Sequence, residues 1–186
     1  MRPSRRPLLR AVALLLGASL LVAGCSEDEP AAKETPALSA EAIQTLVETG
    51  AMQLASGERE AAHATFTSVV EIDPDNVLAH YNLGLIAQEE SDLDGAIEEY
   101  EAALAADPAY GPALYNKAIL LEKSDLKEAV ALYERAVEAQ PDFAPTHMRL
   151  GFALVHLGRT KEGEDHLAKG LALDPSMKDV AAPDYD

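Results

Sequence analysis

The single cysteine of this chain, Cys25, is the residue best suited to covalent chemistry, because a thiolate is a strong nucleophile. It follows a segment with four arginines and an apolar run from Ala11 to Ala23. A run of 13 residues is too short to cross a bilayer, which takes about 20 residues, but it suits the core of a secretory signal peptide. With one cysteine, no disulfide can form within the chain. The sequence therefore predicts an exported protein that makes no internal disulfide.

The residues around Cys25 resemble a bacterial lipobox. In Leu21-Val22-Ala23-Gly24-Cys25, small residues admit the signal peptidase, and the thiol would take a diacylglyceryl group before becoming the new N-terminus. The resemblance implies a lipoprotein signal peptide at 1–24 and a covalent diacylglyceryl lipid on Cys25. The alternative is an ordinary signal peptide with an incidental cysteine. The segment from Ser4 to Arg10 also resembles a twin-arginine export signal, although paired arginines are common in other basic leaders.

The rest of the sequence lacks the spacing typical of a catalytic or metal site. The five histidines do not recur at i, i+4 on one helix, and no second set of ligands accompanies them. The acidic run Glu98, Glu99 and Glu101 is typical of a solvated helix face. The sequence contains neither a glycine-rich phosphate loop nor a nucleophile elbow. We therefore expect that the protein is not an enzyme and that it has no metal and no cofactor apart from the lipid. We expect His80 and His147 to be packed against other residues rather than to bind a ligand.

Four prolines divide most of the remaining chain into units of nearly equal length. Their spacings are 34, 33 and 34 residues, for Pro74, Pro108, Pro141 and Pro175. Each unit has small residues at two fixed positions and a larger residue four positions after the second. The first small set is Gly50, Gly84, Ala118 and Gly151, the second is Ala62, Ala96, Ala129 and Gly163, and the larger set is Phe66, Tyr100, Tyr133 and Leu167. This period and pattern resemble the tetratricopeptide repeat (TPR).

The resemblance covers roughly Glu41 to Pro175 and implies an all-α fold, a right-handed superhelical α-solenoid of four TPR helix-turn-helix repeats. The repeats would lie at about 43–76, 77–110, 111–143 and 144–177. The two helices of each repeat would cross at the small residues, and the second would end before the proline, where the α conformation is disfavoured. The expected helices are 40–55, 59–72, 77–90, 93–106, 112–123, 126–139, 146–157 and 160–173. The third repeat is one residue short, in its first helix or in the turn that follows.

Five residues are expected to shape helix ends and turns. Gly57 and Gly158 fall between the two helices of a repeat, where a positive φ costs a glycine little. Ser39 is expected to cap the first helix, and Ser91 and Ser124 are expected to be N-caps.

The segments on either side of the repeats differ from them in composition. Residues 25–39, the lipidated cysteine and its tether, are acidic, contain Pro30 and Pro36, and carry almost no large apolar residue. They predict a disordered linker of about 20 Å between the lipid and the single folded domain at 40–175. Residues 176–186 form a tail too short for the full solvating helix that usually closes such arrays.

The charge of the chain limits its partners. Residues 1–24 hold four of the 15 basic residues and none of the 32 acidic ones, which leaves 11 against 32 and a net charge of −21. Such a charge repels nucleic acids and anionic lipid surfaces. We expect no nucleic-acid partner, and contact with the membrane through the lipid anchor only.

Matching positions on the first helix of each repeat predict a peptide-binding groove, because residues three and four apart share a helix face. The apolar candidates are Val47, Tyr81, Tyr115 and Met148, followed by Leu85, Ile119 and Phe152, and the polar candidates are Asn82, Asn116 and Arg149. Such side chains offer an extended peptide apolar pockets and hydrogen bonds to its main chain. The alternative is that the apolar members belong to the core and that the asparagines are structural. A clamp for chaperone C-termini is not supported, because apolar side chains and Tyr115 stand where that clamp needs Lys, Asn and Arg.

Two functions fit these observations. The first is a membrane-anchored, extracytoplasmic scaffold or adaptor, in the periplasm or on the cell surface, that binds another exported or envelope protein as a protein or peptide ligand. In layout it resembles TPR lipoproteins that serve pilus-secretin piloting or the recruitment of cell-wall hydrolases. The second is a structural module that assembles weakly with itself through its uncapped C-terminal end.

Overall fold

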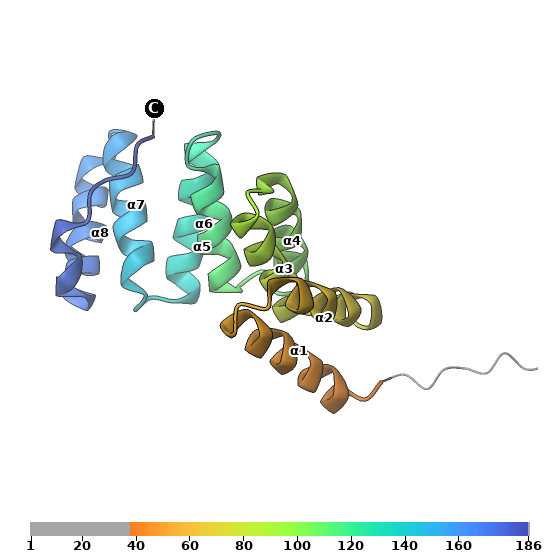
Figure 1. The fold of residues 1–186 in the computed structure, drawn as a ribbon. Coiled ribbons are helices and arrows are strands. Elements are labelled where there is room, and N and C mark those ends of the chain that lie inside the picture. Colours follow the sequence, from red (N-terminus) through yellow and green to blue (C-terminus); the bar gives the residue numbers. More distant parts are fainter. Residues whose placement is uncertain (1–37, 186) are drawn as a thin grey trace, which may run out of the picture. The chain divides into compact units, whose positions relative to one another are not determined.

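The computed structural model describes residues 38–185, so the signal peptide, Cys25 and most of the tether lie outside the described residues. The described part forms eight α-helices arranged as four successive hairpins (Figure 1). The first helix of each hairpin is here called an A helix and the second a B helix. The A helices are α1 (Ala40–Ala55), α3 (Val77–Glu89), α5 (Gly111–Leu121) and α7 (Ala144–His156). The B helices are α2 (Arg59–Ile72), α4 (Leu93–Ala106), α6 (Leu126–Ala139) and α8 (Thr160–Leu173), and a short 3-10 helix, η1 (Pro175–Asp179), follows α8.

The small residues expected at each crossing do lie between the A and B helices. A Cβ on Gly84 would stand 2.6 Å from the ring of Tyr100, and a Cβ on Gly50 would stand 2.7 Å from that of Phe66. In the last hairpin, a Cβ on Gly163 would stand 2.6 Å from the backbone oxygen of Gly151. Distances below about 3 Å are not found between packed carbon and oxygen or ring atoms, so these positions admit no side chain without movement.

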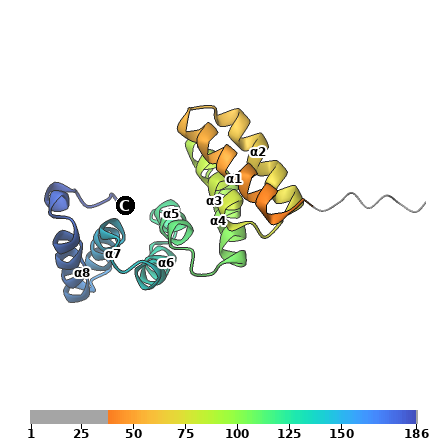
Figure 2. The same ribbon diagram turned by 90° about the horizontal axis from the view of Figure 1, so that it is seen from below.

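Neighbouring hairpins stack through contacts of α2 with α3, α4 with α5, and α6 with α7. The buried residues form separate clusters along the array, one around Phe66 and Leu83, one around Tyr100 and Ala113, and one around Tyr133 and Leu150. Each cluster therefore joins two successive repeats. This arrangement confirms the α-solenoid, and Figure 2 shows the four hairpins following one another along it.

The helix ends agree with expectation in five of the eight helices and differ by one or two residues in the rest. Helix α7 begins at Ala144, two residues earlier than expected, with Pro145 inside its first turn. Helix α5 likewise begins at Gly111, before Pro112. Proline suits the first helical turn because its missing N–H would have no partner there. The expected start of α7 was wrong because it left Pro145 outside the helix, whereas the expected start of α5 included Pro112 and was one residue late.

The shortened third repeat loses length in its A helix. Helix α5 ends at Leu121 and is 11 residues long, whereas α3 and α7 each have 13. In the other hairpins, the A-to-B turn contains a residue of positive φ: Gly57 (78°), Ser91 (65°) and Gly158 (81°). The two glycine predictions are therefore confirmed.

The expected capping roles hold for one serine and fail for two. The Ser39 side chain accepts a hydrogen bond from the amide of Ala42 at 3.2 Å, so this cap is confirmed. The N-caps of α4 and α6 are Asp92 and Asp125, the residues that follow Ser91 and Ser124. A carboxylate caps as well as a hydroxyl does, and it also interacts favourably with the positive end of the helix dipole. Among residues 38–185, no helix is long and apolar enough to span a bilayer.

Candidate peptide-binding groove

The A helices carry the ten candidate groove residues, and eight of them are half-buried: Tyr81, Asn82, Leu85, Tyr115, Asn116, Ile119, Arg149 and Phe152. The other two, Val47 and Met148, are 5% and 4% exposed. Met148 points towards α8, where its sulfur would lie 2.8 Å from a Cβ on Gly170. At this position of the repeat, the valine and the methionine pack between helices, whereas the longer tyrosines of repeats two and three reach the surface. Val47 therefore belongs to the core, whereas Met148 packs against α8 and also lines the cavity described below.

The two groove tyrosines sit in matching aromatic clusters. The ring of Tyr81 lies 6.0 Å from that of Tyr100 and 5.3 Å from that of Tyr110. The ring of Tyr115 lies 5.9 Å from that of Tyr133 and 5.4 Å from that of Phe143. Burial raises the pKa of both Tyr81 and Tyr115, so both stay neutral phenols at physiological pH. Each therefore offers a ligand an aromatic edge and a hydroxyl.

Sequence reasoning missed the third aromatic of each cluster, Tyr110 and Phe143. Both are N-cap residues of an A helix, and they stand 33 positions apart in the repeat register. That spacing was the signal that could have identified them.

The polar candidates already have partners within the chain. The Asn82 amide donates to the Leu78 carbonyl of its own helix at 2.7 Å. The Asn116 amide donates to the Tyr81 hydroxyl at 3.2 Å and so links the A helices of repeats two and three. An amide group has a second donor and an acceptor, so each asparagine keeps hydrogen-bonding capacity for a ligand.

The third polar candidate, Arg149, is paired with a buried carboxylate that sequence reasoning did not identify. Glu122, 6% exposed, accepts from the Tyr133 hydroxyl at 2.7 Å and from Arg149 Nη1 at 2.8 Å. Burial alone would lower the pKa of Arg149, but the carboxylate of Glu122 and the hydroxyls of Tyr133 and Tyr115 together outweigh it and hold the pKa above its usual value. The pair ties α5 and α6 to α7. In repeat two, Gln88 takes the corresponding place and accepts from the Tyr100 hydroxyl at 3.0 Å.

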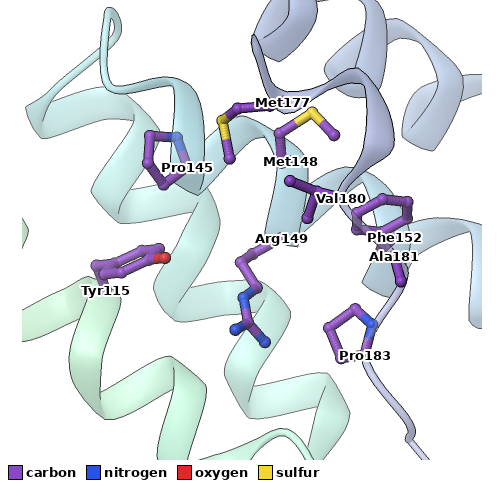
Figure 3. A pocket seen from close by; sticks show the side chains of 9 residues that line it. All are labelled: Tyr115, Pro145, Met148, Arg149, Phe152, Met177, Val180, Ala181 and Pro183. Carbon is purple, nitrogen blue, oxygen red and sulfur yellow. The ribbon is translucent and has the colours of Figure 1, made fainter. Parts of the chain in front are cut away.

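A cavity of about 380 Å³ opens between α5, α7 and the C-terminal tail. Figure 3 shows the guanidinium of Arg149 extending between Tyr115 and Pro183. The helices contribute Tyr115, Pro145, Met148, Arg149 and Phe152. The tail contributes Met177, Val180, Ala181 and Pro183. The cavity thus combines apolar and aromatic walls with a few polar groups, as ligand sites commonly do.

The tail, residues 174–185, packs back onto the A-helix side of repeats three and four. The Tyr185 ring lies 5.1 Å from that of His156, and Lys123 Nζ lies 3.4 Å from Asp184 Oδ2. Tyr185 also packs against the core cluster around Tyr133. The sequence predicted only a short tail here, because this segment has neither a helical period nor a repeat signature.

Two sequence-family models, both described as tetratricopeptide repeat, match residues 53–111 and 120–182. A curated relative is 34% identical over 79 residues, a probable UDP-N-acetylglucosamine–peptide N-acetylglucosaminyltransferase SPINDLY from Solanum lycopersicum. The match covers 42% of this chain but spans only 8% of that relative's length.

Solved structures share the fold. PilF from Pseudomonas aeruginosa is 27% identical with a TM-score of 0.64, over 73% of this chain and 62% of that one. YrrB, described as a TPR protein with an unusual peptide-binding site, is 23% identical with a TM-score of 0.64, over 73% and 74% of the two chains.

Proposed function

Since the chain belongs to the tetratricopeptide-repeat family, we propose that it is a membrane-anchored, extracytoplasmic scaffold that binds an exported or envelope protein. The repeats and the half-buried A-helix face support a role in protein interaction rather than catalysis. One observation carries the proposal: aromatic, amide and guanidinium side chains continue across α3, α5 and α7. YrrB, a similar fold with a peptide-binding site, supports the same kind of ligand.

The membrane anchor rests on the lipobox-like residues that end at Cys25. A thiol is required for diacylglyceryl transfer, and a serine hydroxyl is too weak a nucleophile to replace it. The variant Cys25→Ser should therefore lose labelling by a fatty-acid probe and leave the membrane fraction. A variant that stays labelled would contradict the lipid anchor and leave an ordinary signal peptide as the alternative.

Partner binding is tested by affinity capture with the double variant Tyr115→Ala and Asn116→Ala. Central aromatic residues often cost about 2 kcal/mol or more when truncated at an interface. Capture should weaken at least about tenfold, which corresponds to about 1.4 kcal/mol. The matched control replaces two exposed B-helix residues, Glu98 and Glu138, with alanine and should capture normally.

The stability of the variants decides how a loss of capture is interpreted, because Tyr115 packs on two rings. If the double variant melts at a much lower temperature than the wild type, Asn82→Ala takes its place, since the Asn82 side chain bonds only its own helix. Full capture by a folded groove variant would place the binding surface elsewhere on the array.

A further inference from the structure

The A-helix face of repeats three and four is covered by a segment of the same chain. After α8, the Asp174 carboxylate accepts from the amide of Ser176 at 3.0 Å and from its hydroxyl at 2.7 Å, which starts η1. The chain then runs from η1 past α7 towards α5 (Figure 2). From Val180 it has no helix or strand structure. The tail thus lies where an extended peptide ligand would lie.

Three kinds of contact hold this segment. Pro183 and Val180 face Phe152 and Arg149 across the cavity (Figure 3). Asp184 pairs with Lys123 in the turn between α5 and α6. The Tyr185 ring lies tilted against that of His156, and Tyr185 packs against the core cluster around Tyr133. Proline, an acidic residue and a tyrosine are therefore recognised in that order along the face.

Several of these contacts are weak, which favours replacement of the tail by another segment that binds the same face. The Tyr185 hydroxyl is buried and has no hydrogen-bond partner within the described part of the chain. A buried polar group without a partner is unfavourable. The cavity of about 380 Å³ remains beneath the tail, and Val180 is 46% exposed. The Lys123–Asp184 pair is 3.4 Å long with both side chains largely exposed, and such pairs contribute little.

We propose that the tail is an internal ligand, and that the partner of this face is a protein with an extended segment of the same chemistry. That segment would carry a proline, then an acidic residue and a tyrosine, and it would displace residues 180–185. A competing segment with bulkier apolar residues before the proline would fill the cavity that the tail leaves. This inference rests on the proposed function, because it specifies the ligand of the same A-helix face.

A tryptophan reporter tests the occupancy of the face, because the chain contains no tryptophan. In the full chain carrying Tyr185→Trp, fluorescence should occur at shorter wavelength than in the free peptide of residues 176–186 with the same change. Acrylamide should also quench it less. Equal emission and quenching in chain and peptide would show that the tail does not sit on this face.

Exchange is tested by adding the unmodified peptide of residues 176–186 in excess to the Tyr185→Trp chain. The tryptophan should become exposed, with longer-wavelength emission and stronger quenching. A control peptide with Tyr185→Ala should compete at least about tenfold less well, a difference of about 1.4 kcal/mol. A protected tryptophan that no peptide concentration exposes would overturn the proposal and make the tail a permanent part of the fold.

A second measurement uses the wild-type chain, because the indole ring of Tyr185→Trp is larger than the phenol ring and changes the packing of the tail. Hydrogen exchange of the wild-type chain should show amides 180–185 protected, and excess peptide should remove that protection. If the peptide fails in both assays while capture still depends on Tyr115 and Asn116, the proposed function stands and this inference is wrong. If the peptide displaces the tail but partner capture does not depend on Tyr115 and Asn116, the proposed function fails instead.

Discussion

At the scale of single residues, the crossing of α7 and α8 brings two helix backbones close together. A Cβ on Gly163 would meet backbone atoms of Gly151 and Val155 at 2.6 and 2.9 Å, and backbone cannot move aside as a side chain can. We expect Gly163→Ala to lower the free energy of unfolding by about 1 to 3 kcal/mol, the usual cost of overpacking. Thermal or urea denaturation followed by circular dichroism measures this.

The matched control for that substitution, Gly170, lies about two turns further along α8. A Cβ on Gly170 would first meet the flexible side chain of Met148, at 2.8 Å. Since Met148 can change rotamer, Gly170→Ala should cost clearly less than Gly163→Ala. Equal losses would show that the backbone at the crossing is free to shift.

A histidine pair gives the last repeat a dependence on pH. His147 Nδ1 lies 3.0 Å from His166 Nδ1, and His147 Nε2 donates to the Pro141 carbonyl at 3.0 Å. Burial and the neighbouring His147 lower the pKa of His166 below its usual value, and three nearby carboxylates oppose this shift: Glu134, Asp165 and Glu162. The unfolded chain, with a histidine pKa of about 6.5, then takes up the proton first as the pH falls. Stability is therefore fully present above about pH 6.5, and the melting temperature should fall on acidification through that value.

The second repeat provides the control for this pH effect. There, His80 makes the corresponding contact with Glu99 at 2.7 Å and with the Pro74 carbonyl at 2.9 Å. The variant His166→Glu copies that arrangement, and a carboxylate favours a protonated imidazole. The loss of melting temperature on acidification should shrink in this variant. An unchanged pH profile would assign the effect to other groups.

The sequence predicted the small and large residues at the crossings because their sizes recur at a fixed period. It could not predict the role of Glu122, because a glutamate at a helix end normally faces solvent. Only the Tyr133 hydroxyl and Arg149, 11 and 27 residues further along, make its burial tolerable. Val47 lies in the core for a related reason, since the offset fixes the Cβ direction but not where the side chain ends.

At the scale of helices and turns, Ser91 adopts a conformation better suited to glycine. Its φ of 65° corresponds to 78° and 81° at Gly57 and Gly158 in the equivalent turns. The left-handed conformation costs a residue with a Cβ about 1 to 2 kcal/mol, whereas glycine loses about 0.5 to 1 kcal/mol through the entropy of the unfolded chain. Ser91→Gly should therefore stabilise the protein by up to about 1 kcal/mol, measured by denaturation.

The third repeat supplies the comparison, because Ser124 is not among the described residues of positive φ. Ser124→Gly gains nothing in the folded state and should destabilise by about 0.5 kcal/mol from unfolded-state entropy alone. Stabilisation by both substitutions would contradict the assignment of strain to Ser91. The sequence aligned these two serines and predicted one role for both, but the shorter α5 gives the third turn a different backbone.

At the scale of the whole array, the last helix is polar on its outward side. The exposed residues of α8 include charged side chains, among them Lys161, Glu164 and Lys169, and none of the exposed large hydrophobic residues of the described chain lies on α8. An end of this kind does not need a second copy to cover it.

We therefore expect residues 26–186 to be monomeric in solution. Light scattering should give the mass of one chain, independent of protein concentration. A mass that rises with concentration would favour the alternative of self-assembly. The sequence raised that alternative from the length of residues 176–186 alone, since neither the polar face of α8 nor the path of the tail could be derived from the repeat pattern.

Stacking by neighbour contacts also determines how the array comes apart. Each cluster of buried residues joins two adjacent repeats, so the loss of repeat one removes one interface and leaves the others intact. Repeat four is held to repeat three by the Glu122–Arg149 pair, whose carboxylate is buried, whereas the Arg59–Glu89 pair that joins repeat one to repeat two is largely exposed. Local unfolding should therefore start at repeat one and proceed towards repeat four. The amide hydrogens of α1 and α2 should exchange before those of α7.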